Sequence, residues 1–324
     1  MLGWFDRLQR RFGILGFPLA VRQKYSDDQG GYLAATIAYY GFFSIFPLLL
    51  VLTTVLGFLL RGHPHLQSRI VGTALGQFPV IGNELHSQSL HGKTLALVIG
   101  IVGALWAGMG CVLAASNAMD QIWAVPFTHR PDFLRSRARA LLLLLVLGGG
   151  VLATTALAGA GSVGARYGIA WKILSIAASV VLNFLLFWVA FRILTVRDVT
   201  WRELRVGAGA AAIGYEIVQL VGGYYVGHTL KNASNVYGTF ALVIGLLSFI
   251  YLSAHVTLLA AEVNVVAQRK LWPRSFSVGG QRAPTEADRL VLTQLSRVET
   301  RRHDERIEVT IPAGDGPAER QPDG

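Results

Sequence analysis

Six long apolar runs, which carry almost no charged residues, most constrain what this chain can fold into. Each run is close to or above the roughly 20 residues that an α-helix needs to cross the hydrocarbon core of a bilayer. Only 15% of the 324 residues are charged, whereas soluble proteins carry about a quarter. The sequence therefore predicts an all-α, polytopic membrane helix bundle with six transmembrane helices. The predicted spans are Tyr32 to Leu60, Thr94 to Met119, Ala140 to Ala160, Ile173 to Phe191, Val206 to Val226, and Val236 to Ala267.

The distribution of lysine and arginine predicts the orientation of these spans. Segments 1–31, 120–139, 192–205 and 268–324 together carry 23 of the 29 basic residues, and the three other connections carry the remaining 6. Cytoplasmic connections are the ones enriched in Lys and Arg. Both termini are therefore expected in the cytoplasm, which agrees with an even number of spans.

The same pattern divides the chain into three parts. Residues 1–31 are expected to form a cytoplasmic region with an interfacial amphipathic helix, because Trp4, Phe5, Leu8 and Phe12 fall on one helical face. Residues 32–267 form the six-span domain. Residues 268–324 form a basic tail with one short helix, whose capping pattern begins around Thr285, and a disordered end rich in Pro, Gly and charge.

The net charge of +10 indicates a preference for anionic partners. Basic residues flank the apolar runs instead of forming a stripe on a soluble domain, so anionic lipid headgroups at the cytoplasmic face are the expected partner. Nucleic acid is not expected, because no recognisable nucleic-acid-binding fold accompanies the charge. A homo-oligomer is compatible with this pattern, and the substrate is left open.

Neither a cofactor nor a catalytic site is expected. The single cysteine, Cys111, lies inside an apolar run. Four histidines gather in the 61–93 connection, but their spacing matches no common metal-ligand pattern and no Cys or Asp joins them. No nucleophile–base pair stands out, so enzymatic activity is not predicted. The four histidines of the 61–93 connection are His63, His65, His86 and His91.

Glu216 is the sharpest candidate for a functional group within the spans. It lies at the centre of the fifth run, too deep for its side chain to reach an interface. On a helix it shares a small, polar face with Gly209, Ala212 and Gln219. One interpretation is a proton or cation site; the other is a protonated glutamate that hydrogen-bonds a neighbouring helix.

The sixth run carries Ser248, His255 and Glu262 at seven-residue intervals, hence on one helical face. His255 falls at mid-depth, where it is either proton-linked or a hydrogen-bonded core histidine. Glu262 falls near the cytoplasmic surface, where pairing with Arg192 or Arg202 is the simpler expectation.

Asn117 and Asp120 lie three residues apart at the inner end of the second run. They are expected either to cap the end of that helix or to join the same inner vestibule as Glu262.

The stretch AYYGFFSIFPLLL interrupts the first run with polar residues and a proline. Pro47 cannot donate a backbone hydrogen bond and displaces the carbonyl of Phe43, so the helix is expected to kink near mid-membrane. Ser44 could satisfy that carbonyl. With Tyr40 and Glu216 at similar depth, these residues suggest a polar pocket at the midplane; the alternative is that Pro47 only curves a long helix.

Two motifs stand out: Tyr39, Tyr40, Phe43, Ser44 and Pro47 in the first run, and Tyr237, Gly238, Ala261, Glu262 and Asn264 in the last. Together they resemble the YihY/BrkB family of bacterial inner-membrane proteins, some of which carry an old ribonuclease label. The resemblance covers about residues 1–275, and it departs from the family pattern at Ala260, where glycine is common. It implies a six-span fold, with transport and envelope integrity as suggested roles.

Two functional hypotheses follow. The first is a transporter or permeation pathway for a small solute, lipid or ion, which predicts a water-accessible cavity between the first, fifth and sixth spans. The second is a non-transporting organiser of the membrane or envelope that binds lipids or partner proteins, which predicts a filled bundle held by interhelical hydrogen bonds.

Overall fold

The computed structural model describes residues 13–59, 94–163, 169–196, 199–225, 231–274, 285–302 and 304–310. Within these residues the chain is all-helical and has no strand, as the sequence predicts. Six long helices fall on the six apolar runs, one on each. They are α3 (Gly30–Leu59), α6 (Thr94–Ile122), α7 (Phe133–Val163), α8 (Ile169–Leu194), α9 (Trp201–Tyr225) and α10 (Lys231–Arg269).

Four of these helices contain segments that are long and apolar enough to cross a membrane, counted over the described residues. The segments are Gly30–Leu48, Val98–Ile122, Trp201–Gly222 and Val243–Arg269, and α8 adds the shorter apolar stretch Val180–Leu194. That all six helices cross the membrane remains a prediction.

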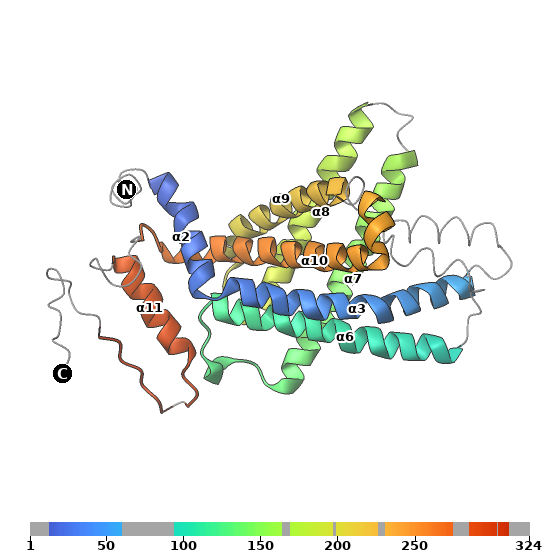
Figure 1. The fold of residues 1–324 in the computed structure, drawn as a ribbon. Coiled ribbons are helices and arrows are strands. Elements are labelled where there is room, and N and C mark those ends of the chain that lie inside the picture. The colour runs from blue at the N-terminus through green and yellow to red at the C-terminus, as the bar shows by residue number, and fades with distance from the viewer. Residues whose placement is uncertain are drawn as a thin grey trace.

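The six helices pack in a closed ring whose order is the chain order. Each contacts the next, from α3 to α6, α7, α8, α9 and α10, and α10 then packs against α3. Figure 1 shows α3, α6 and α10 running side by side along the bundle. The ring brings the first, fifth and sixth predicted spans together, because α9 and α3 both lie against α10.

Small residues allow the helices of the ring to approach closely. Ala34, Ala118 and Ala208 are fully buried between helices, while large apolar side chains such as Trp106 and Leu220 point outward. This arrangement is typical of a bundle whose outer surface faces lipid, where packing of small residues holds the helices together.

Helix α2 (Gly13–Asp27) crosses the end of the bundle and packs mainly against α10 (Figure 1). A sharp turn after Asp28 sets its direction, because Gln29 adopts a left-handed conformation with φ 55°. A side chain at Gly30 would collide with the ring of Tyr25 at 2.3 Å. The expected interfacial residues Trp4 to Phe12 lie outside the described residues; α2, which follows them, is a packed part of the bundle.

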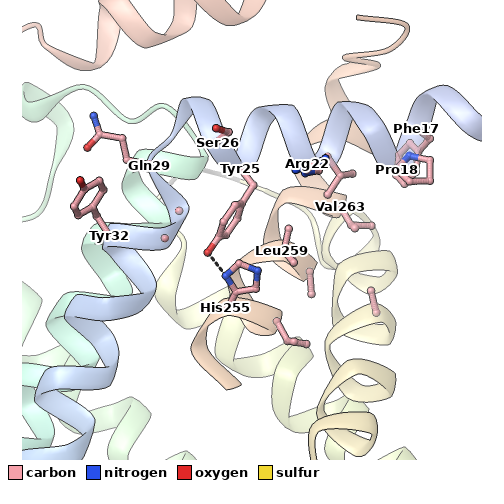
Figure 2. Close-up of a pocket in the computed structure, with 16 residues that line it drawn as sticks. Phe17, Pro18, Arg22, Tyr25, Ser26, Gln29, Tyr32, His255, Leu259 and Val263 are labelled. Atoms are coloured by element: carbon pink, nitrogen blue, oxygen red, sulfur yellow. Dashed lines mark hydrogen bonds between the residues drawn. The ribbon is translucent and has the colours of Figure 1, made fainter. Parts of the chain in front are cut away.

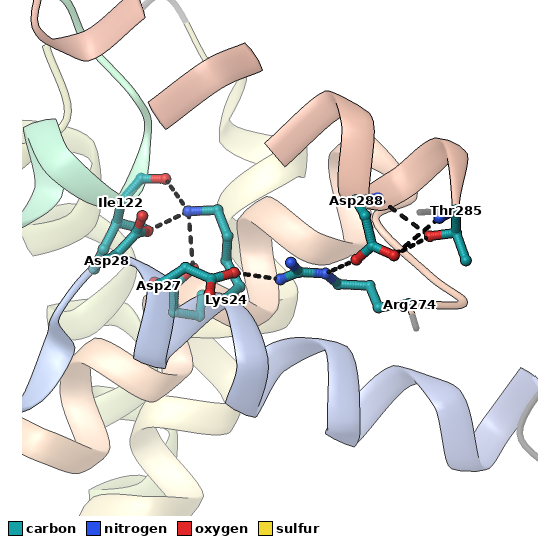
Figure 3. A network of polar contacts seen from close by, with 8 residues as sticks. Lys24, Asp27, Asp28, Ile122, Arg274, Thr285 and Asp288 are labelled. Carbon is teal, nitrogen blue, oxygen red and sulfur yellow. Dashed lines mark hydrogen bonds and ion pairs between the residues drawn. The ribbon is translucent and has the colours of Figure 1, made fainter. Parts of the chain in front are cut away.

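Helix α11 (Glu286–Val298) lies beside the same end (Figure 1). As predicted, Thr285 caps it: its hydroxyl accepts a hydrogen bond from the backbone N–H of Asp288, and the Asp288 carboxylate accepts one from Thr285. Arg274, which follows α10, pairs with Asp27 of α2 at 2.6 Å and with Asp288 at 2.9 Å (Figure 3). One buried arginine therefore ties α2 to α11.

Candidate functional site

A pocket of about 870 Å³ opens under α2, between α2, the start of α3, α9 and α10 (Figure 2). Its walls are mostly apolar and include Val21, Leu259 and Val263. Exposed Arg22 lines it as well, and Tyr25 and His255 supply polar atoms inside it. The pocket therefore combines an apolar body with a cationic group and a polar pair, a combination suited to an amphipathic ligand.

The polar pair joins α2 to α10. The hydroxyl of Tyr25 lies 2.6 Å from Nδ1 of His255, and the two rings meet edge to face at 4.7 Å. Burial, with smaller contributions from Tyr251 and Glu262, raises the pKa of Tyr25 above its ordinary value. The phenol therefore keeps its proton and can donate it in the hydrogen bond to His255 (Figure 2).

A second cluster of polar side chains lies at the C-terminal end of α2, in the contact with α10. Lys24 is 1% exposed, Asp28 1% and Glu262 0%. The ammonium of Lys24 donates to the Asp28 carboxylate and, at 3.3 Å, to the carbonyl of Ile122 at the end of α6 (Figure 3). Its Nζ also lies 3.7 Å from Oε2 of Glu262. We call Lys24, Asp28 and Glu262 the buried triad.

The triad corrects the expectation for Glu262. Its described cationic partner is Lys24 of α2, not Arg192 or Arg202, because α2 folds over the end of α10 and covers the carboxyl group. Neither Glu262 oxygen has a hydrogen bond within the described residues, and Oδ1 of Asp28 has none either. Burial raises the pKa of Asp28 above its ordinary value, although Lys24 opposes the shift.

Glu216 and Gln219 do not line this pocket. Oε1 of Glu216 accepts a hydrogen bond of 2.8 Å from Nδ2 of Asn183 on α8, and Glu216 is half-buried. Gln219 is exposed and donates to the hydroxyl of Tyr215 at 3.2 Å. The structure thus places Glu216 in a polar contact between α8 and α9, apart from His255.

Ser44, Pro47 and Tyr40 do not line the pocket either. Helix α3 continues through Pro47 to Leu59. Ser44 donates to the carbonyl of Gly41 at 2.7 Å, not to that of Phe43. The ring of Pro47 lies against Gly103 and that of Tyr40 against Gly110, both on α6. These residues therefore shape the contact between α3 and α6.

Asn264 joins α10 to α9; it directly follows Val263 and comes one helical turn after Ala260, both of which line the pocket. Its Oδ1 accepts a hydrogen bond of 2.6 Å from the backbone N–H of Gly207, and the side chain is buried. A side chain at Gly207 would lie 2.3 Å from the carbonyl oxygen of Ala260. The amide therefore sets the close approach of the two helices.

The remaining predicted residues are separate from the pocket. Asn117 is exposed and Asp120 is buried, and neither caps α6, which continues to Ile122. Tyr237 and Gly238 fall within the bounds of α10 but outside the residues whose side chains are described.

Sequence reasoning missed Lys24, Tyr25 and Asp28. The sequence contains part of the signal for this pair: Lys24 and Asp28 are four residues apart, so a helix places them on one face. Their burial depends on the turn that lays α2 over α10, which local sequence does not reveal. Asn183 was missed because its contact with Glu216 depends on how α8 packs against α9.

No group of three or more His, Cys, Asp or Glu residues that could hold a metal ion occurs within the described ranges. His63, His65, His86 and His91 lie outside those ranges.

Comparison with known proteins gives several related membrane proteins. The chain is 25% identical over 292 residues to "Inner membrane protein YhjD" of Escherichia coli, covering 83% of this chain and 86% of that protein. It is 23% identical to "Putative ribonuclease-like protein YfkH" of Bacillus subtilis, with 76% and 93% coverage. It is 26% identical to "UPF0761 membrane protein Smlt0865" of Stenotrophomonas maltophilia, with 81% and 63% coverage. No solved structure matches.

The family described as "Virulence factor BrkB" matches residues 21–283. This range includes α3 to α10, the last part of α2 and therefore every residue of the buried triad. The apolar helices and the relatives named as membrane and inner-membrane proteins give a consistent location in the bacterial cell membrane. The chain is an integral membrane protein of the BrkB family.

Proposed function

We propose that this protein is a transporter, and that the pocket under α2 binds its substrate from the cytoplasmic side. The observation that carries the proposal is an open pocket of about 870 Å³ bounded by three of the predicted spans and by α2. A pocket of this size holds a small organic molecule. The substrate class that fits is an amphipathic solute or lipid with an acidic group, because the lining is largely apolar and includes Arg22.

The orientation belongs to the same proposal. Six crossings with both termini in the cytoplasm place α2, α11 and the pocket at the inner face, where anionic headgroups and basic residues meet. A solute could then enter sideways from the inner leaflet or directly from the cytoplasm. Binding and passage are proposed, with no chemical conversion.

A second candidate function is that of a non-transporting membrane organiser. The hydrogen bond between Asn183 and Glu216 supports it, because it is the interhelical contact that a filled bundle would use for its buried acid. The flux measurement below separates the two candidates.

The transporter proposal is tested by filling the pocket. Leu259 and Val263 line it from α10, so Val263→Trp should occlude it. We expect the purified wild type in proteoliposomes to move a fluorescent anionic phospholipid or a small aromatic carboxylate across the bilayer. Val263→Trp should reduce that flux about tenfold or more, because the indole ring would occupy the space of the substrate.

The matched control is Leu220→Trp, which places the same side chain on the outward, lipid-facing side of α9. It should leave flux unchanged. Absence of flux for both probes in a well-folded wild type would contradict the transporter proposal and favour the organiser. Equal flux in Val263→Trp and wild type would exclude this pocket as the path.

A further inference from the structure

The buried triad has an imbalance of charge that the described contacts do not remove. Lys24 contributes one positive charge, and Asp28 and Glu262 contribute two negative charges when both are ionised. All three side chains are essentially excluded from solvent. A net buried charge costs several kcal/mol, and such clusters normally become neutral by gaining or losing a proton.

Lys24 cannot satisfy both acids equally. It donates closely to Asp28 and to the Ile122 carbonyl, whereas its distance to Glu262 is 3.7 Å, beyond a normal hydrogen bond. Glu262 is thus the acid with the weaker contact to the ammonium. Both of its oxygens, and Oδ1 of Asp28, lack a donor within the described residues.

The two carboxyl groups meet at the same ammonium group, since Lys24 donates to Asp28 and its Nζ lies 3.7 Å from Oε2 of Glu262. As carboxylates both groups are acceptors only, so they compete for the donors of Lys24 and neither can donate to the other. One proton on either acid supplies the missing donor and also cancels the excess charge. Asp27 is the other described acid whose charge is felt by Glu262, but Asp27 is paired with Arg274. Tyr25 is a further neighbour and is a neutral phenol.

We propose that Asp28 and Glu262 form a binding site for one shared proton, which locks α2 onto α10 in the arrangement seen here. With the proton bound, the triad is neutral and its carboxyl groups are hydrogen-bonded. When the proton leaves, the buried contact carries a negative charge, and hydration of that charge favours separation of α2 from α10. The site stands independently of the proposed transport; only a link between proton release and pocket opening rests on that function.

Infrared difference spectroscopy tests the site directly. A protonated carboxyl group has a C=O stretching band that is distinct from the bands of carboxylates and amides. We expect the full-length protein at pH about 7, where an ordinary Asp or Glu is ionised, to show such a band that is lost in Glu262→Gln. In this variant Asp28 and Lys24 remain as a balanced pair.

Asp28→Asn is the second variant, because Glu262→Gln could impair folding. It leaves Lys24 and Glu262 balanced, so the band should also disappear. Glu286→Gln, at the exposed start of α11, is the matched control and should keep it. Absence of a carboxylic acid band in the wild type would overturn the proposal. A band that persists in both variants would also overturn it.

The pH dependence of stability gives an independent readout. An acid whose folded-state pKa is raised binds more protons in the folded than in the unfolded protein, so stability falls as the pH rises above about 4, the unfolded value. One such proton lowers the folded-to-unfolded ratio up to tenfold per pH unit until the folded protein also releases it. Glu262→Gln should flatten this part of the wild-type profile.

A metal cation is the competing occupant. If the triad bound sodium, added NaCl would raise the melting temperature of the wild type above that in equal choline chloride, and Glu262→Gln would abolish the difference. That result, without a carboxylic acid band, would overturn the proton assignment. Equal melting temperatures in the two salts are expected.

Discussion

At the residue scale, Asn264 and Gly207 show how two helices are held at contact distance. The backbone N–H of Gly207 donates to the Asn264 side chain, and the absent side chain of Gly207 makes room for the Ala260 carbonyl. Buried side-chain to backbone hydrogen bonds of this kind are costly to break, because each partner would be left unsatisfied in a medium without water.

Replacing Gly207 by alanine should therefore destabilise the protein. The new methyl group would lie 2.3 Å from the Ala260 carbonyl oxygen, and such overpacking costs about 1–3 kcal/mol. Thermal unfolding of the detergent-solubilised protein measures the loss. Gly209→Ala is the control on the same helix, since nothing lies within 4 Å of a side chain there. Equal melting temperatures for the two variants would contradict the close packing.

At the element scale, α2 is joined to its surroundings by two polar clusters. The buried triad ties it to α10, and Arg274 ties Asp27 to the cap of α11. Arg269, at the end of α10, also holds α11, because its Nη1 donates to Oε1 of Gln294 while its Nη2 donates at 2.6 Å to the carbonyl of Trp123. A change at α11 can therefore reach α2 through one side chain.

Substituting Arg274 by methionine should loosen α11. The substitution leaves Asp27 and Asp288 without their shared cation, which should lower the stability of this contact by about 3 kcal/mol. This value is at the low end for a buried pair because the Asp27 side chain is 34% exposed. We expect faster cleavage of α11 by chymotrypsin. Arg302→Met, which breaks the exposed pair with Asp304, should cleave at the wild-type rate, because exposed pairs contribute little. Unchanged cleavage of Arg274→Met would contradict the clamp.

The helices could be predicted from sequence far better than the site. Absence of charge is a local property, so the predicted second span and α6 begin at the same residue, Thr94. Helix α7 begins earlier than predicted, at Phe133, because arginines at an interface do not interrupt a helix. His255 was recognised from its depth, but its partner Tyr25 was not, since that contact depends on a turn at Gln29.

At the scale of the whole molecule, the six helices and the distribution of basic residues predict one topology in the membrane. An even number of crossings places both ends of the chain on one side, and the basic segments predict that this side is the cytoplasm. In the predicted arrangement α2, the segment after α6, and α11 share the inner face, and the 61–93 connection lies outside.

Single cysteines introduced into a Cys111→Ala background measure this topology. Ser68→Cys, in the 61–93 connection, should react with a membrane-impermeant maleimide in intact cells. Ser26→Cys and Thr293→Cys, on exposed or half-buried positions of α2 and α11, should react only after permeabilisation. The reverse pattern would contradict the orientation, and a split between Ser26 and Thr293 would contradict the even number of crossings.

The ring order has a consequence for how the protein is made. Because α10 closes the ring against α3 and α9, the last helix to leave the ribosome completes the bundle. Until then Lys24 and Asp28, synthesised early, lack Glu262, and α3 has an unpaired flank in the membrane. Closure of the ring is therefore a late event, and a nascent chain that stops before α10 presents an open bundle to the quality-control proteases of the cell.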